Sequence, residues 1–499
     1  MKSKKILSTL LALSCVFSFA ACEVENAHGG VIFPQTSGPQ EGPAVVENVK
    51  DCLNAPTGLP VYTDDGERFE MLAFGLPRYR NESIFKDMAD AGITLAILDN
   101  WSGHGKFDSP ELEASLLAAE QAGVDVLIST DNGYGNRGNG AQYGEGNEWR
   151  TIAGITTDYT QFKAFRGIMI FDEPGGTYGN TGEYNDFDHL EREWALWKNY
   201  WVDPDGEGPK EAVFKNGTHE DYLFYVNGCG DIEHVFNPLA ERIYPIIEGD
   251  CVVSIDHYPF KYDNAAKRAY MSENGLYHVE AFANYARDND DLFWNFLETT
   301  DIYNTGRTAD TNSMLSEVEI RMQHGMSMAF GATGFEYFTY ATASDMKGYV
   351  DNGGTKYESY YYCQKINQEV QKFAHVFMDF KWQGLIPVLG TKNAVGYNDA
   401  FDLLTTPLEI TDNDRLRSVS ATRDTLVGCF KDGNGFDGYM LVNYNDPYYR
   451  KSDDVSIRFN NATKAVVWNR GESKVVDLTN GTFNYKLLSG DWAFVIPVV

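Results

Sequence analysis

The sequence predicts a (β/α)8 barrel followed by an all-β sandwich domain, and two observations carry that prediction. Eight apolar runs that look like buried strands recur from Met71 onward, and most are separated by segments with a helical period. After Trp382 the helical period stops, and short strands alternate with Asn, Gly and Asp turns. A doubly wound open sheet is the alternative for the first part, but no Gly-x-Gly-x-x-Gly motif follows its first strand. We therefore expect a barrel over residues 61–382 and a sandwich over 383–499.

The eight apolar runs of the predicted barrel are nearly continuous in hydrophobicity, as expected of parallel strands that are covered on both faces. They are MLAFGLP (71–77), TLAILDN (94–100), DVLISTDN (125–132), GIMIFDEP (167–174), YLFYVN (222–227), VVSIDHYPF (252–260), LFWNFLET (292–299) and GFEYFTYAT (334–342). The later sandwich strands are TLVGCFK, YMLVNYN, VSIRF, KAVVWN, SKVVDL and WAFVIPVV.

Helices are predicted between the strands from apolar residues that recur every three or four positions. One such segment carries Phe187 and Leu190 together with Trp194, Trp197 and Trp201. This spacing makes the three tryptophans a core stripe of an amphipathic helix in preference to a platform for sugar stacking.

The N-terminus reads as a signal peptide over residues 1–22, with a lysine-rich head, an apolar stretch and small residues before Cys22. Small residues directly before a cysteine resemble the bacterial lipoprotein processing site, so a lipid on Cys22 would be the sole membrane attachment. Phe19 departs from that pattern, in which leucine is usual, and ordinary secretion stays an alternative. Residues 23–60 are rich in Gly, Pro, Asn, Gln and Ser and are expected to form a flexible tether. We expect an exported bacterial protein at the cell surface or in the periplasm.

Charge and cysteine content exclude several classes of function. The net charge of −31 is incompatible with nucleic-acid binding, which depends on basic groups that displace counterions. Beyond Cys15 and Cys22 the chain has five scattered cysteines, which are Cys52, Cys229, Cys251, Cys363 and Cys429. No CxxC motif or Cys/His cluster is present, so neither a metal nor another cofactor is predicted. Free thiols are favoured over a Cys229–Cys251 disulfide.

Polar residues stand at the carboxyl ends of the eight predicted strands, where a parallel barrel gathers them at one mouth. In strand order they are Arg78, Asn100, Asn132, Asp172 with Glu173, Asn227, His257 with Tyr258, Glu298 and Tyr340. Trp101, just past the second strand, is the candidate for stacking on a sugar ring. Because desolvating such a polar set has a free-energy cost, we expect it to form a binding site.

Two glutamates end the fourth and seventh strands, which lie across the barrel axis from each other. Hydrolysis of a glycosidic bond needs one neutral carboxyl group to protonate the departing oxygen and one carboxylate to attack the anomeric carbon. Glu173 and Glu298 are therefore the candidate catalytic residues. Glu336, inside the eighth strand, is the second candidate for the attacking carboxylate, and Glu280 competes less strongly.

The segment from about residue 65 to about residue 345 resembles glycoside hydrolase clan A, the retaining (β/α)8 glycosidases, and in particular its β-galactosidase-like branch. FDEP is similar to the clan's Asn-Glu-Pro motif, LFWNFLET to its seventh strand, HYPF to its strand-six region, and HGMSMAFGATGFEYFTYAT to its last helix and strand. The resemblance implies Glu173 as acid/base, Glu298 as nucleophile and Tyr258 as a hydrogen-bond partner of the nucleophile.

Two positions depart from that pattern. Asp172 replaces the asparagine that donates to the sugar 2-hydroxyl, and the eighth strand lacks the usual tryptophan. The function we predict is an exported retaining glycoside hydrolase that cleaves an oligo- or polysaccharide with β-linkages, with Asp172, Tyr258, His257, Asn132, Asn227, Arg78, Trp101 and Tyr340 in substrate binding. The alternative is a carbohydrate-binding surface lipoprotein that has lost turnover.

Overall fold

The computed structural model describes residues 56–64, 66–77, 83–99, 107–129, 152–175, 186–201, 213–263, 265–300, 315–342, 346–392 and 400–499. The predicted signal peptide and most of the predicted tether lie outside these residues. None of the helices in the described part is long and apolar enough to cross a bilayer.

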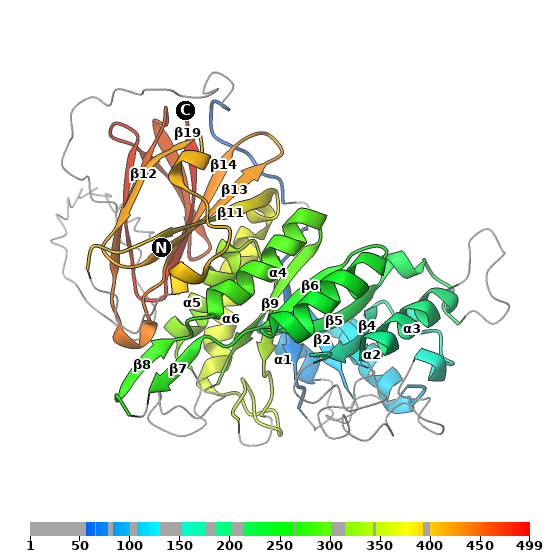
Figure 1. Cartoon of the computed structure of the whole chain (residues 1–499). Coiled ribbons are helices and arrows are strands. Elements are labelled where there is room, and N and C mark those ends of the chain that lie inside the picture. Colours follow the sequence, from blue (N-terminus) through cyan, green and yellow to red (C-terminus); the bar gives the residue numbers. More distant parts are fainter. Residues whose placement is uncertain are drawn as a thin grey trace, which may run out of the picture. The chain divides into compact units, whose positions relative to one another are not determined.

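A closed barrel of eight parallel strands forms the first domain, as predicted (Figure 1). Its strands are β1 (Glu70–Phe74), β2 (Leu95–Leu98), β3 (Asp125–Ser129), β4 (Phe165–Asp172), β5 (Leu223–Cys229), β6 (Val252–Asp256), β9 (Leu292–Glu298) and β10 (Gly334–Phe338). Closure comes from parallel pairing of β1 with β10, in which Glu70 lies opposite Gly334 and Phe74 opposite Phe338. All eight predicted strands are therefore confirmed, in the predicted order.

Helices accompany the strands as the periodicity predicted. They are α1 (Ser83–Asp90), α2 (Pro110–Ala122), α3 (Asp186–Asn199), α4 (Gly275–Asn289), α5 (Glu317–Ala329) and α6 (Glu358–Phe377). Between β5 and β6 the chain instead forms short turns of π- and 3-10 helix over Ile232–Phe236, Leu239–Ile243 and Tyr244–Ile246. A small antiparallel hairpin, β7 (Phe260–Asp263) with β8 (Arg268–Met271), precedes α4. Other single 3-10 turns are Ile152–Gly154, Tyr159–Gln161, His219–Asp221, Ala400–Leu403, Ile410–Asp412 and Pro447–Tyr449.

Two antiparallel sheets make up the C-terminal domain. The first has the order β11 (Phe380–Val388), β13 (Thr425–Asp432), β14 (Asp437–Asn443), β19 (Trp492–Val498), β16 (Lys464–Asn469) and β17 (Glu472–Asp477). The second has the order β12 (Leu416–Ala421), β15 (Asp453–Phe459) and β18 (Thr482–Leu487). Val427 and Leu441 from the first sheet share one apolar core with Ile457 and Phe483 from the second, so the predicted sandwich is confirmed.

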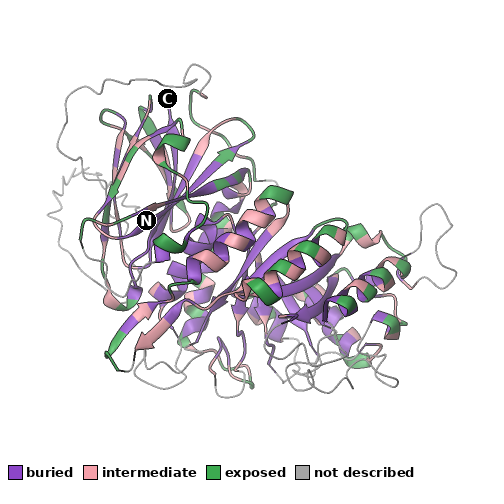
Figure 2. Ribbon diagram, viewed as in Figure 1, coloured by how far each residue is buried: buried purple, intermediate pink, exposed green. Residues whose placement is uncertain are grey.

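The interior of the barrel is apolar away from the carboxyl ends of its strands. One buried cluster enclosed by the ring of strands contains Leu72, Leu127, Met169 and Trp294. Figure 2 shows buried residues along the barrel strands and exposed residues on the outer faces of the helices. The polar groups described next lie towards the carboxyl ends of the strands.

The tryptophan stripe is core, as predicted. Trp194, Trp197 and Trp201 are all buried, and the rings of Trp197 and Trp201 each pack against Phe214. The four described cysteines after Cys52 are free, as favoured by the sequence, whereas Cys52 lies outside the described residues.

Candidate active site

The turn after β4 holds the first candidate catalytic residue in a fixed position. The pairing of β4 with β5 shifts register between Met169 and Phe171, after which Asp172 lies opposite Asn227. Bulges of this kind change the direction in which the following side chains point. The N–H of Glu173 then donates to the carbonyl of Asn227 at 2.9 Å. Glu173 has a φ of 52°, in the left-handed region that non-glycine residues seldom adopt.

A hydrogen bond to α3 also holds this turn. The N–H of Gly175 donates to Oδ2 of Asp186, the first residue of that helix, at 2.7 Å. Gly175 has a φ of 75°, and a Cβ there would lie 2.3 Å from the carbonyl oxygen of His234. Neighbouring elements therefore leave Glu173 little freedom to move, which is what a proton donor of defined direction requires.

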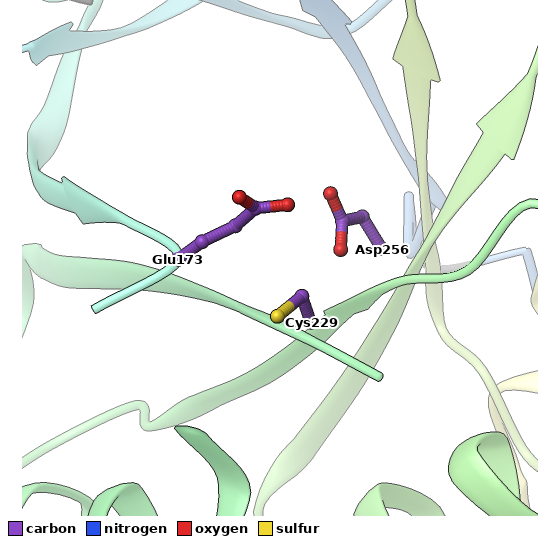
Figure 3. Close-up of side chains that lie close together, drawn as sticks. All are labelled: Glu173, Cys229 and Asp256. Carbon is purple, nitrogen blue, oxygen red and sulfur yellow. The ribbon is translucent and has the colours of Figure 1, made fainter. Parts of the chain in front are cut away.

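Glu173 meets Asp256, the last residue of β6, and Cys229, the last residue of β5. Their carboxylate and thiol atoms lie within 4.8 Å of one another. Figure 3 shows the carboxyl groups of Glu173 and Asp256 facing each other, with Cys229 beside them. All three side chains are half-buried.

Burial is the largest cause that raises the pKa of Asp256 well above its usual range, and the charge of Glu173 acts in the same direction. The charge of Asp172 adds to the effect. Burial and Asp256 likewise raise the pKa of the Cys229 thiol. At neutral pH, Cys229 is therefore a neutral thiol, and its surroundings favour the protonated form of Asp256.

A chain of hydrogen bonds runs beneath this pair through the barrel interior. Asn227 donates from Nδ2 to Oδ1 of Asp172 at 2.9 Å, and its Oδ1 lies 2.9 Å from Ser254 Oγ. Ser254 Oγ also lies 2.7 Å from Glu336 Oε1. The hydroxyl of Tyr225 bonds Glu336 Oε2 and lies 2.8 Å from Ser254 Oγ. These five residues link β4, β5, β6 and β10.

Burial raises the pKa of Glu336 to about 8, although its bonds to Tyr225 and Ser254 oppose the shift. The hydrogen count agrees with a neutral carboxyl group. If Glu336 donates to Ser254, then Ser254 can donate to Asn227 while Tyr225 donates to Glu336. A protonated and fully bonded carboxyl group is a poor nucleophile, so these contacts suit a buried structural residue better than the second candidate for the attacking carboxylate.

Glu298 ends β9 and is fully buried. Because side chains alternate along a strand, that of Glu298 lies on the same face of β9 as those of Trp294 and Phe296. Trp294 lies in the inner barrel core, and the ring of Phe296 packs edge-on against Phe74 of β1. Its backbone is held by Gln323 of α5, which accepts from the N–H of Glu298 at 2.8 Å and donates to its carbonyl at 2.9 Å. The strand end is thereby fixed with the side chain on the inner face.

The remaining predicted residues divide between the mouth and the surrounding helices. Tyr258 packs against Phe338, the β10 residue that lies opposite Glu298. His257 packs edge-on against His278 of α4, and burial lowers its pKa to about 3. Tyr340 is buried with its ring edge-on to Tyr349.

Three predicted binding residues, Arg78, Asn132 and Trp101, lie outside the described residues, as does Asn100. Glu280, the weakest of the three candidates for the attacking carboxylate, lies on α4 and accepts hydrogen bonds from Thr405 and Thr406. It joins that helix to the segment between β11 and β12 of the sandwich.

The sequence reasoning missed Asp256, Ser254 and Cys229. The sixth apolar run was read as ending at His257 and Tyr258. Strand alternation could have found Asp256, because Val252, Ser254 and Asp256 share one face and Val252 lies in the inner core. Nothing local in the sequence indicates that Cys229 comes to lie beside Asp256.

Two groups of described residues bring three potential metal ligands together: Glu173 with Cys229 and Asp256, and His219 with Glu220 and Glu248. In the first group, burial favours the neutral forms of Asp256 and Cys229, whereas a cation is bound by the deprotonated forms. In the second, Glu248 is bonded to both His219 and Lys198, so its charge is already balanced. We assign neither group as a metal centre.

No protein-family model and no curated protein matches the sequence. The fold is similar to solved structures of glycoside hydrolases at low identity. A glycoside hydrolase family 5 protein from Bacteroides vulgatus has a TM-score of 0.47 and 11% identity over 88% of this chain and 93% of that one. A glycoside hydrolase family 30 subfamily 8 xylanase from Clostridium acetobutylicum has a TM-score of 0.39 and 10% identity, and the match covers 88% of this chain and 97% of that one.

A β-galactosidase from Marinomonas ef1 has a TM-score of 0.40 and 13% identity, and the match covers 61% of this chain and 60% of that one. At such identities the similarity concerns the fold alone. The chemistry of this site has to be derived from its own residues.

Proposed function

We propose that this protein is a retaining glycoside hydrolase that cleaves a β-linked glycan, with Glu173 as acid/base and Glu298 as nucleophile. The observation that carries the proposal is that both glutamates follow strands of one closed parallel barrel at its carboxyl end. Catalytic residues of this fold come from that end. Two strands, β5 and β6, separate β4 from β9, and they contribute the polar groups between the two glutamates.

The chemistry follows a double displacement. The carboxylate of Glu298 attacks the anomeric carbon while the bond to the leaving oxygen breaks and that oxygen takes a proton from Glu173. Water then attacks the anomeric carbon, Glu173 accepts the proton of this water, and Glu298 is released as a carboxylate. Tyr258, packed beside the β10 residue opposite Glu298, is positioned to contact the nucleophile or the sugar.

Kinetics of Glu173→Ala and Glu298→Ala test the assignment. We expect each to lower hydrolysis by several orders of magnitude with the fold intact by circular dichroism. Azide should rescue Glu298→Ala and give an α-configured glycosyl azide from a β-linked substrate. Glu280→Gln, which changes a buried glutamate away from these strand ends, is the matched control and should stay close to wild type.

The substrate for these assays comes from a screen of aryl glycosides and plant polysaccharides, with product stereochemistry read by proton NMR. Full activity in both alanine variants would remove the assignment. Oligosaccharide binding by calorimetry with no sugar released over days would instead support the alternative, a carbohydrate-binding protein without turnover.

We also propose export with a lipid on Cys22, because three lysines, an apolar stretch and small residues precede this cysteine. Palmitate labelling and membrane fractionation in a bacterial host test it. Cys22→Ser should lose the label and leave the membrane fraction. A wild-type protein that is unlabelled and released would indicate ordinary secretion.

A further inference from the structure

The carboxyl groups of Glu173 and Asp256 face each other from the turn after β4 and the end of β6, and their carboxylate atoms lie within 4.8 Å. Two ionised carboxylates this close in a half-buried site repel each other, so the arrangement favours a state in which the two groups hold at least one proton. The turn itself is held by the bond from the N–H of Glu173 to the carbonyl of Asn227 and by the bond from the N–H of Gly175 to the carboxylate of Asp186.

The groups around the pair favour retention of that proton. Asp172 of β4 acts on Asp256 with its negative charge. Cys229 of β5 contributes a neutral thiol. Glu298 ends the neighbouring β9, and on the side of α4, His278 meets His257, not Asp256. The charges that act most strongly on Asp256 are thus all acidic.

We propose that Glu173 and Asp256 hold one proton between them and that this pair, in place of Glu173 alone, is the proton donor of the reaction. Asp256 is then a positioning residue that acts through Glu173. This inference rests on the proposed function for its kinetic part, whereas the shared proton itself does not depend on catalysis.

The proton balance explains why a pair suits both steps. In the first step the proton leaves Glu173 for the departing oxygen, and if it resided on Asp256 it first crosses the hydrogen bond between them. Two adjacent carboxylates remain, which repel each other in a half-buried site. Their repulsion makes the pair a stronger base towards the incoming water. Taking one proton from that water restores the starting state.

The pH profile of kcat/KM in Asp256→Asn tests the pair. The neutral amide keeps the size of the side chain and can donate an N–H to Glu173, which favours the ionised form of that carboxylate. We expect the basic limb to move to lower pH by about one unit or more. The loss of kcat should be larger for glycosides with poor leaving groups than for dinitrophenyl glycosides, which need little protonation. The proposal would be overturned if the basic limb of the pH profile stayed at its wild-type position and kcat fell equally for glycosides with poor leaving groups and for dinitrophenyl glycosides.

Cys229→Ser is the matched control because it changes the third member of the cluster without removing a carboxyl group. Its basic limb should coincide with that of wild type. Activity that EDTA abolishes and a divalent metal restores would also overturn the proposal, because the cluster would then bind a cation in place of the proton.

Infrared spectroscopy separates failure of this inference from failure of the proposed function. The difference spectrum at neutral pH between Glu336→Gln and Glu336→Gln/Asp256→Asn should show the carbonyl band of one protonated carboxyl group. Using the Glu336→Gln background removes the neutral carboxyl group that lies in the hydrogen-bond chain beneath the pair. If Asp256→Asn does not fold, Glu173→Gln in the same background serves as the partner variant, and it should shift that band. Absence of the band would overturn the shared proton even in an active hydrolase, whereas its presence in a protein without hydrolysis would refute only the enzymatic role.

Discussion

The side-chain amide of Asn227 donates to Asp172 across 2.9 Å at the point where β5 and β4 lie opposite each other. Both side chains are buried. Asp172 stands where the resembling glycosidases have an asparagine that donates to the sugar. Here the amide belongs to the next strand and the carboxylate accepts from it.

Asn227→Ala should destabilise the protein, because it removes the donor to Asp172 inside the barrel. We expect the free energy of unfolding to fall by about 2–3 kcal/mol, the range for losing a buried bond to a charged group. Urea unfolding measures it. Asn289→Ala is the matched control, since the exposed Asn289 donates only to the carbonyl of Tyr285, and its effect should stay within about 0.5 kcal/mol. Equal losses in the two variants would contradict the importance of the Asp172 contact.

Gly175→Ala should disturb the turn that holds Glu173. The new Cβ would lie 2.3 Å from the carbonyl oxygen of His234 at a φ of 75°. We expect a loss of more than about 2 kcal/mol in stability together with lower hydrolytic activity. Gly123→Ala shares the unfavourable backbone, with a φ of 73°, but meets no atom within 4 Å. It should cost about 1 kcal/mol and leave catalysis unaffected, so a similar outcome for both variants would indicate backbone strain alone.

Trp197→Ala should act on stability and not on sugar affinity, because the ring packs against Trp201 and Phe214 with no exposed surface. A cavity of this size typically costs about 3–5 kcal/mol. Leu117→Ala, on the exposed face of α2, is the control and should change little. Thermal unfolding and calorimetric titration with an oligosaccharide separate the two roles. Weaker sugar binding with unchanged stability would restore the sugar-platform interpretation.

The barrel could be predicted because most residues of its strands are buried and apolar. The strands Leu416–Ala421 and Thr482–Leu487 of the small sheet were not predicted, since LRSVSA contains the exposed Ser418 and Ser420 and TFNYKL alternates half-buried with buried residues, so neither is a continuous apolar run. The other sheet already begins at Phe380, separated from the end of α6 by two residues and inside the range predicted for the barrel.

The candidate site was predictable at the level of single strand ends but not of contacts between them. Glu173 and Glu298 follow from the apolar runs that precede them. The approach of Asp256 to Glu173 depends on barrel closure and on the register shift within β4, and neither leaves a local signal in the sequence.

Glu336→Gln should flatten the pH dependence of stability. The pKa of Glu336 is raised to about 8 in the folded protein from 4.5, so the folded state binds the proton more tightly than the unfolded chain does. Its contribution is therefore lost as the pH rises from about 4.5 to about 8, at about 1.4 kcal/mol for each unit of pKa difference. Glutamine can keep the contacts by accepting from Tyr225 and donating to Ser254.

Urea unfolding of wild type and Glu336→Gln from pH 5 to 8 measures this difference. The comparison has to be made against wild type, because burial also raises the pKa of Glu193 to about 7. Parallel curves would show that Glu336 is ionised when folded. The same variant separates the two candidate nucleophiles, since Glu336→Gln should keep hydrolysis within about tenfold of wild type while Glu298→Gln loses several orders of magnitude. The reverse order would transfer the nucleophilic role to Glu336, because an inert hydrogen-bonded carboxyl group cannot be needed for covalent attack.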